Sequence, residues 1–137
     1  MTGQERGGAV SAPMAVAVLV MLITIGLAVD GVRAVEGFVR ADAIAEEAAR
    51  AAAQSLDSGR LQRGQAVIDP AAAAAAVHDY LDAAGASGEL AVAGPGRVRV
   101  DVRLTRPTVL LGLIGRSELT STGTADAEVI PLTPDGG

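Results

Sequence analysis

Residues 7–29 read GGAVSAPMAVAVLVMLITIGLAV, and this run of 23 positions contains no charged side chain. At about 1.5 Å of rise per residue, a helix over the run is roughly 30 Å long or more, which is enough to cross the hydrocarbon core of a bilayer. Charged residues lie on both sides: Glu5 and Arg6 precede the run, and Asp30 and Arg33 follow it. We therefore predict a membrane-spanning helix over residues 9–29, preceded by a leader at residues 1–8.

A cleaved secretory signal peptide is the alternative interpretation of this run, because Gly26-Leu27-Ala28 has the small-x-small pattern of a cleavage site. The run, however, is longer than the ~7–15 apolar residues of a typical signal peptide, and only Arg6 and the terminal amine supply positive charge before it. An uncleaved anchor fits the sequence better. Arg6 and the amine nearly balance Arg33 and Arg40 on the other side, so charge does not decide the orientation. Because the leader is short, we predict a single-pass protein of the cell membrane, with a cytoplasmic N-terminus and the C-terminal domain outside.

Composition limits the classes of function. The chain has 137 residues, a net charge of −5, no Cys and no Trp, and all 11 basic residues are Arg. Without Cys there is neither a disulfide framework nor a thiolate nucleophile. An acidic chain with no basic cluster has unfavourable electrostatics for binding nucleic acid, so we predict no nucleic-acid partner.

Residues 30–56 continue with helical periodicity, and charged residues occupy the opposite side of the predicted helix. The anchor and this extension are therefore predicted to form one helical rod of about 45 residues. Its narrow stripe of small and apolar residues packs either on this chain's own sheet or on a neighbouring subunit, since small residues let two backbones approach closely. The stripe consists of Ala34, Phe38, Ala41, Ala45, Ala48, Ala52 and Leu56. The candidate interaction residues of this stripe are Phe38, Ala41, Ala45, Ala48 and Ala52.

A polar, glycine-punctuated linker is predicted over residues 57–69, followed by a small extracytoplasmic domain over residues 70–130 and a flexible tail over residues 131–137. Asp69 and Pro70 form a strong helix start, with a side-chain cap and Pro at the first helical position. Gly85 stands where a C-terminal cap is expected. The apolar face of this second helix contains Ala73, Val77, Leu81 and Ala84.

The period then changes to two, which predicts strands. Leu90 and Val92 alternate with other residues before the turn at 94–96, and four apolar residues alternate with Arg and Asp over residues 97–104. A third alternating run over residues 117–130 has acidic outer residues that can face the arginines of the middle strand. The predicted fold is α+β: a transmembrane helix, its long alanine-striped extension, a second helix and an antiparallel sheet of about three strands.

Residues 107–115, PTVLLGLIG, are the most apolar stretch after the anchor and are predicted to be a short helix or loop. One interpretation is that they cover the edge of the sheet or cap the core. The other is a patch that contacts the membrane or a partner, because an uncovered apolar patch usually marks a contact. The candidate contact residues are Val109, Leu110, Leu111, Leu113 and Ile114.

Signals for catalysis are weak. His78 is the only His, with Asp79 and Asp82 nearby, whereas a metal site normally needs three or four converging ligands. The carboxylate pair Glu46/Glu47 lies on a predicted solvated face, and neither a GxSxG elbow nor a phosphate-binding loop occurs. We therefore predict no enzymatic activity, no cofactor, no metal and no small-molecule substrate. An anchored enzyme that depends on His78 or a carboxylate stays as a third hypothesis.

Several segments together resemble one family. They are ERGGAVS at residues 5–11, VDGVR at 29–33, ADAIAEEAARA at 41–51 and the apolar stretch at 107–115. In this combination the chain resembles the TadE/TadG-like proteins of tight-adherence (Flp) pilus assembly, especially the short actinobacterial members. The resemblance implies a pilin-like fold and a non-enzymatic, membrane-anchored role as a minor pilin or assembly component of a pilus or related secretion system. Its implied partners are the lipid bilayer and other pilus or secretion-system membrane subunits.

The resemblance also implies a possible processing site, because pilin-like members are cut after a Gly that has Glu five residues further on. Gly8 and Ala9 are the candidate residues on the two sides of such a cut. Here Pro13 is the fifth residue after Gly8, and residues 7–29 contain no acidic side chain. The alternative function is an unrelated single-pass envelope adaptor or binding module that uses residues 109–114 as its contact surface.

Overall fold

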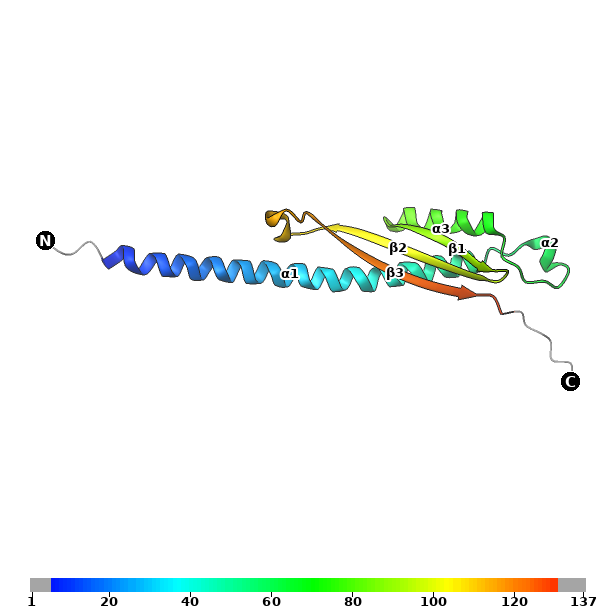
Figure 1. The fold of residues 1–137 in the computed structure, drawn as a ribbon, viewed down its shortest axis with the longest axis horizontal. Helices are drawn as coiled ribbons and strands as arrows, with labels where there is room; N and C mark the ends of the chain where they lie inside the picture. Colours follow the sequence, from blue (N-terminus) through cyan, green and yellow to red (C-terminus); the bar gives the residue numbers. More distant parts are fainter. Residues whose placement is uncertain (1–5, 131–137) are drawn as a thin grey trace, which may run out of the picture. The chain divides into compact units, whose positions relative to one another are not determined.

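The computed structural model describes residues 6–130, with side chains from residue 11 onward. It has the predicted α+β composition, with helices and one three-stranded sheet (Figure 1). In chain order the elements are α1 (Arg6–Ala53), α2 (Ser58–Leu61), α3 (Pro70–Ala84), β1 (Ser87–Gly94), β2 (Arg97–Pro107), the 3-10 helix η1 (Leu111–Ile114) and β3 (Glu118–Glu128).

Helix α1 is a single helix of 48 residues with Pro13 inside it, which confirms the prediction of one continuous rod. The helix ends at Ala53, slightly before the predicted end near Leu56. Within Ser11–Ala53 its most apolar 18-residue window has a mean hydropathy of 2.5, and none of that window is buried by the rest of the chain. By length and composition, α1 can therefore cross a membrane.

The chain divides into two compact units. The first comprises the chain up to Val35 together with Pro107–Leu119, so it contains the apolar part of α1 and η1. The second comprises Glu36–Arg106 and the residues from Thr120 onward, and it contains the sheet, α3 and the alanine-rich part of α1. We describe each unit by itself.

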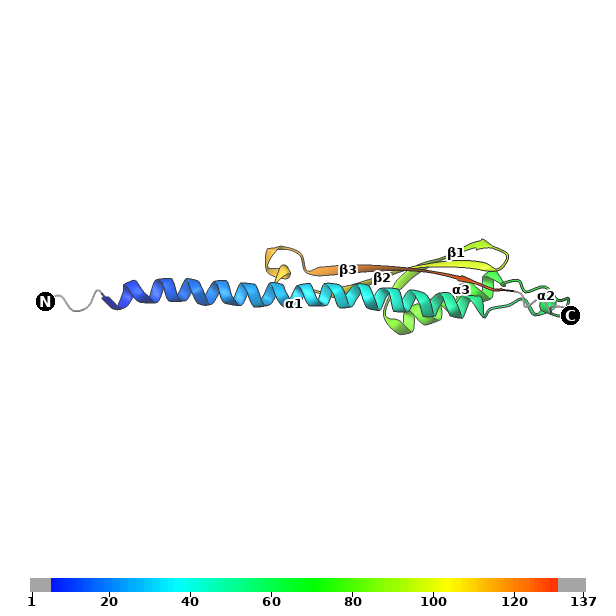
Figure 2. The ribbon, with the colours of Figure 1, turned by 90° about the horizontal axis from the view of Figure 1, so that it is seen from below.

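In the second unit the strands lie in the order β1-β2-β3. β1 and β2 pair antiparallel, with Leu90 opposite Val100 and Val92 opposite Val98. Figure 2 shows the helices of this unit on one side of the sheet. Val98, Val100, Val102 and Leu104 of β2 are fully or almost fully buried beneath them, whereas Arg97, Arg99 and Arg103 are exposed on the other face. The core is thus a two-layer arrangement of small helical residues against valines; its members on β2 are Val98, Val100, Val102 and Leu104.

Close helix–strand packing depends on small residues in both elements. A Cβ at Gly123 of β3 would overlap the backbone of Ala41 and Asp42 in α1, and a Cβ at Gly37 would overlap the Ser121 hydroxyl. Because neither element has a bulky side chain at these points, the backbones can approach closely. This explains why a chain with one Phe and no Trp still has a closed core.

Helix α3 begins and ends as the sequence predicts. The Asp69 side chain accepts hydrogen bonds from the N–H groups of Ala71 and Ala72, at 2.9 and 3.2 Å, and Gly85 closes the helix with φ = 66°. Ala73, Val77 and Leu81 are its buried residues. Residues 57–69, predicted as a linker, also contain the one-turn helix α2, whose N–H of Arg60 donates to Asp57 at 3.0 Å.

Candidate functional site

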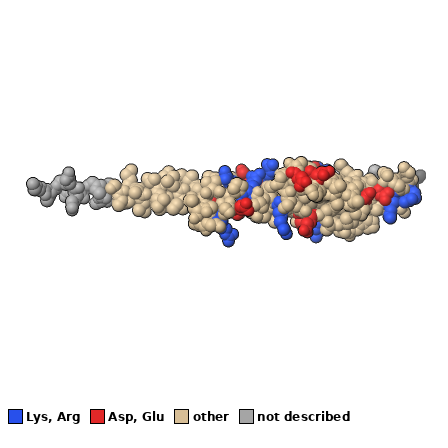
Figure 3. All heavy atoms as spheres, turned by 90° about the horizontal axis from the view of Figure 1, so that it is seen from above, with Lys and Arg blue, Asp and Glu red and all other residues tan. Residues whose placement is uncertain are grey.

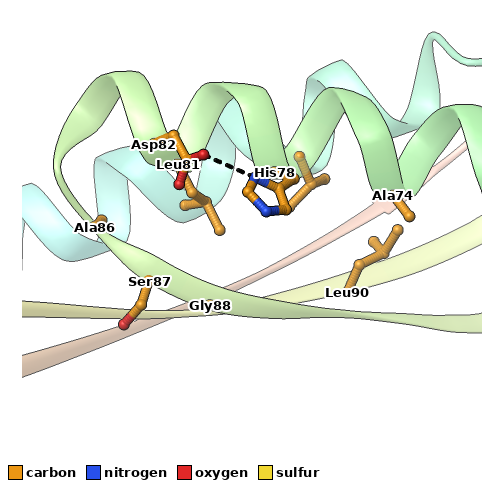
Figure 4. Close-up of a pocket in the computed structure, with 9 residues that line it drawn as sticks. Ala74, His78, Leu81, Asp82, Ala86, Ser87, Gly88 and Leu90 are labelled. Atoms are coloured by element: carbon orange, nitrogen blue, oxygen red, sulfur yellow. Dashed lines mark ion pairs between the residues drawn. The ribbon is translucent and has the colours of Figure 1, made fainter.

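His78 and Asp82 line a groove between α3 and β1 (Figure 4). The Nδ1 atom of His78 lies 3.0 Å from an Asp82 carboxylate oxygen, and the two side chains are 73% and 69% exposed. The i, i+4 spacing places both side chains on the same face of α3. Their exposed fractions show that this face is solvated. Over residues 11–130 we find no group of three or more His, Asp or Glu side chains placed to hold a metal ion. This groove offers a solvent-exposed contact between a histidine and an aspartate.

The outer face of the sheet carries the ion pairs predicted from strand alternation. Arg97 lies 2.6 Å from Glu128, and Arg99 contacts Asp126 with two hydrogen bonds of 2.9 and 3.0 Å. The hydrogen bond from Arg99 lowers the pKa of the Asp126 carboxyl, against the opposing effect of burial. All four side chains are about half exposed, so each pair contributes little to stability. The two pairs connect β2 to β3 across the outer face of the sheet.

The most unusual polar contact in the described chain is in the first unit, at the end of the apolar run. Asp30 is only 4% exposed, and its carboxylate accepts backbone N–H groups from three consecutive residues of the segment that leads into η1. These hydrogen bonds come from Val109 at 2.8 Å, Leu110 at 2.9 Å and Leu111 at 3.0 Å. A carboxylate bound by three N–H groups caps the start of the 3-10 helix from outside its own segment.

These contacts also keep Asp30 ionised. The Val109 N–H has the largest effect and lowers the pKa of the Asp30 carboxyl, followed by the Leu111 N–H. Burial acts in the opposite direction, while the Leu110 N–H and the charge of Arg33 lower the pKa further. A buried carboxylate is expected to be charged only where such donors replace water. Asp30 is therefore an anionic tether for the loop that contains η1.

That loop, residues 108–117 and called the η1 loop below, presents apolar side chains. Leu113 and Ile114 are 81% and 75% exposed, and Val109 is 52% exposed. Leu110 is half-buried against α1: a Cβ built on Gly26 would lie 3.0 Å from the Leu110 side chain. The sequence predicted a short helix or loop here, and η1 confirms the short helix. None of the four residues of η1 is buried.

The predicted alanine stripe is located in the second unit. Ala41, Ala45, Ala48 and Ala52 are all fully buried in this chain's own core, which corresponds to the first of the two interpretations. These four alanines are thus covered by the sheet and α3, and we do not retain them as contact residues. Phe38 was assigned to the same stripe, and this assignment is wrong: Gly37 is the buried residue, and Phe38 is 50% exposed. Ser121 fills the space beside Gly37, so the buried face passes through residue 37 rather than 38.

Residues 8–55 match the model of the Tad family, described as "Putative Flp pilus-assembly TadE/G-like". The match confirms, over this part of the chain, the family resemblance predicted from the sequence. It covers nearly all of α1 and ends just beyond it. No curated protein and no solved structure matches the chain.

Within the TadE/G-like segment, the candidate processing residues Gly8 and Ala9 lie in the first turns of α1. Their side chains are outside the part that the structure describes, so processing stays a prediction. Leader residues 1–5 and the predicted tail at residues 131–137 are likewise outside the described residues.

Sequence reasoning predicted candidate contact residues in the η1 loop, which stay a prediction, but it missed the hydrogen bonds of Asp30. The local signal for Asp30 was only that of a charged residue that ends an apolar run. Its partners lie 79 to 81 positions further along the chain. No local pattern indicates such a distant pairing, although a lone acidic residue among apolar neighbours is reason to look for one.

Proposed function

We propose that this protein is a membrane-anchored, non-enzymatic component of Flp pilus assembly, of minor-pilin type. The observation that carries the proposal is helix α1, which makes up nearly all of the TadE/G-like match at residues 8–55. Its apolar part can cross a membrane, and its alanine-rich part packs within a small α+β unit. A membrane helix that continues into a small folded unit is the architecture that a pilin-like subunit requires.

The distribution of charge supports the anchor. Figure 3 shows an uncharged surface along the apolar part of α1 and charged side chains beyond it. Large aliphatic side chains remain exposed along this part, including Leu19 at 56%, Met21 at 64% and Leu22 at 60%. In water such a surface is costly, whereas in lipid it is favourable. We therefore propose that residues 9–29 lie in the membrane. The orientation, with the N-terminus in the cytoplasm and the second unit outside, stays a separate prediction.

The partners that this function requires are other membrane subunits of the pilus system, contacted through the exposed surface of the anchor. Exposed Phe38 and the apolar residues of the η1 loop are further contact candidates outside the anchor. Solvated charged pairs and the absence of a metal-binding group within residues 11–130 add no support for an enzymatic alternative.

Photo-crosslinking in the source bacterium tests this function. A photoreactive amino acid in place of Leu22 is expected to form covalent products with Flp pilus-assembly subunits in intact cells. The same replacement at Leu61 of α2, which is 49% exposed, is the matched control and is expected to form far fewer of them. Deletion of the gene should reduce surface pili, and the full chain should restore them.

Unchanged pili after deletion, together with Leu22 products that contain no pilus component, would contradict the proposal. That outcome would favour the second candidate, a single-pass envelope adaptor. The exposed Leu113 and Ile114 favour this alternative, since a binding module needs an apolar contact surface. Protease treatment of intact cells tests the orientation separately. The added protease should digest the second unit if that unit lies outside the membrane and leave it intact if it lies in the cytoplasm.

A further inference from the structure

We propose that the tip of the η1 loop, Leu113 and Ile114, inserts into the lipid bilayer beside the C-terminal end of the membrane span. The bilayer is thus contacted twice, by α1 and by a loop distant in sequence. This inference rests on the proposed function in one respect only, namely that residues 9–29 form the span. Its basis is the geometry of the first unit, in which the η1 loop and the apolar part of α1 are in direct contact.

The depth of the loop follows from its two contacts on α1. Asp30, the first charged residue after the span, binds the N–H groups of Val109, Leu110 and Leu111. Gly26 lies four residues earlier, hence one helical turn deeper on the same face, and it contacts the Leu110 side chain. The Leu110 side chain therefore reaches about 5 Å, the pitch of one turn, past the polar end of the span.

Backbone polarity is the usual reason why irregular segments do not enter lipid. In the η1 loop, hydrogen bonds within the chain remove much of the free-energy cost of bringing backbone N–H and C=O groups into lipid. Asp30 takes the three N–H groups at its start, and Thr108 N–H donates to the Ser117 carbonyl at 3.0 Å. The Thr108 hydroxyl binds the Arg116 carbonyl at 2.6 Å, and the Arg116 N–H binds the Leu111 carbonyl at 2.9 Å. A loop closed in this way can present side chains to lipid without exposing many free backbone groups.

The side chains agree with an interfacial position. Leu113 at 81% and Ile114 at 75% are among the most exposed large hydrophobic residues in the described chain. Gly115 and then Arg116 follow directly, and Arg33 lies one turn beyond Asp30 on α1. Arginines beside an apolar tip suit the headgroup region, where they contact phosphate while the tip stays in the acyl chains. The tip also continues the apolar surface of the span, where Ile23 and Leu27 are 44% and 54% exposed.

Single-cysteine labelling tests the insertion directly, because the native chain has no Cys. The full chain is reconstituted in phosphatidylethanolamine/phosphatidylglycerol vesicles with a fluorophore at Leu113→Cys. Leu19→Cys marks the span, and Leu61→Cys on α2, where Leu61 is 49% exposed, is the aqueous control. We expect lipid-attached nitroxide to quench the Leu113 probe at least about three times as strongly as the Leu61 probe. Iodide in the aqueous phase should quench the Leu61 probe more strongly than the Leu113 probe. Asp30→Ala is expected to move the Leu113 probe toward the aqueous value.

Failure of the inference is distinguishable from failure of the anchor. A Leu19 probe that iodide reaches would overturn the proposed membrane span itself. A lipid-protected Leu19 with a Leu113 probe as exposed to iodide as Leu61 would overturn only the insertion of the loop. A Leu113 probe shielded from both quenchers would show that protein covers the tip, such as a second copy of the chain, and would equally overturn the lipid contact.

Discussion

The two parts of α1 have the same backbone conformation but opposite surfaces. In the apolar part, Met14 is 67% exposed and Leu19 is 56% exposed, and charged side chains are absent up to Asp30. In the alanine-rich part, Ala45 and Ala48 are fully buried and charged residues such as Glu46 are exposed. The first part has large side chains that are mostly uncovered by protein, whereas the second has small side chains that the sheet covers closely.

This contrast shows how one helix can serve in two environments. Large aliphatic residues gain most where lipid surrounds them, because nothing has to fit against them closely. Alanine gains little from burial, but it allows the sheet to approach the helix backbone, as the Gly123 contact with Ala41 shows. The size of the side chain, rather than helix propensity, therefore distinguishes the two parts.

Among the substitutions considered, Ala45→Leu in the alanine-rich part of α1 should have the largest effect on stability. Added carbon atoms overpack the closed core of the second unit, so we expect destabilisation by about 1–3 kcal/mol. In the apolar part, Ala17→Leu is expected to change stability by less than about 0.5 kcal/mol, because Ala17 is exposed in the protein. Denaturant unfolding of the full chain in detergent micelles, followed by circular dichroism, measures both.

Ala43→Leu is the matched control for this prediction, since Ala43 is on the same part of α1 but exposed. It should resemble Ala17→Leu. Equal destabilisation by Ala43→Leu and Ala45→Leu would show that close cover by the sheet does not distinguish these positions.

Asp30→Ala tests the boundary between the two parts of α1. Loss of the carboxylate removes the acceptor for three N–H groups, so we expect amide exchange at Val109, Leu110 and Leu111 to accelerate by roughly tenfold or more. Hydrogen exchange of the full chain in micelles, read by mass spectrometry, measures this change. Asp42→Ala, at an exposed carboxylate of the same helix, is the control and should leave exchange in residues 109–111 unchanged.

Asp69→Ala tests a cap that lies next to its own helix in the sequence, in contrast to Asp30, whose partners are distant. Because Asp69 accepts the N–H groups of Ala71 and Ala72, its loss should cost about 1 kcal/mol of unfolding free energy. Asp79→Ala, an exposed position within α3, should change stability by less than about 0.5 kcal/mol. A loss at Asp79 as large as that at Asp69 would argue against the cap. Denaturant unfolding again provides the measurement.

The smallest expected effect concerns pH on the outer face of the sheet. Arg99 lowers the pKa of Asp126 in the folded protein below 3.8, so the pair stabilises the fold above this pH. This stabilisation is lost as the pH falls through the folded pKa of Asp126. NMR titration of the Asp126 carboxyl should show the low midpoint, and Arg99→Gln should raise it toward 3.8. Arg103→Gln, on the same face of β2, is the control; an equal rise there would contradict a specific pair.

Local signals predicted much of this fold from the sequence. The Asp69-Pro70 start and Gly85 end of α3 lie where the capping residues indicated, since a cap depends on residues within one turn. Alternation placed the valines of β2 inside and Arg97, Arg99 and Arg103 outside. It also predicted that acidic residues of the third strand can face these arginines, as the Arg97–Glu128 and Arg99–Asp126 pairs do. Helix α2 was missed because its single turn begins at one capping residue, Asp57, within an otherwise polar segment.

The sequence by itself determined that an uncharged apolar helix continues into an alanine-rich helix, and that a capped helix and alternating strands follow. These features depend on composition and on short-range periodicity. Only the tertiary structure decided that Gly37 rather than Phe38 faces the sheet, because Ser121 occupies that space. It alone also joined Asp30 to the η1 loop, since hydrogen bonds between residues about 80 positions apart arise from the packed backbone and leave no periodic trace in the sequence.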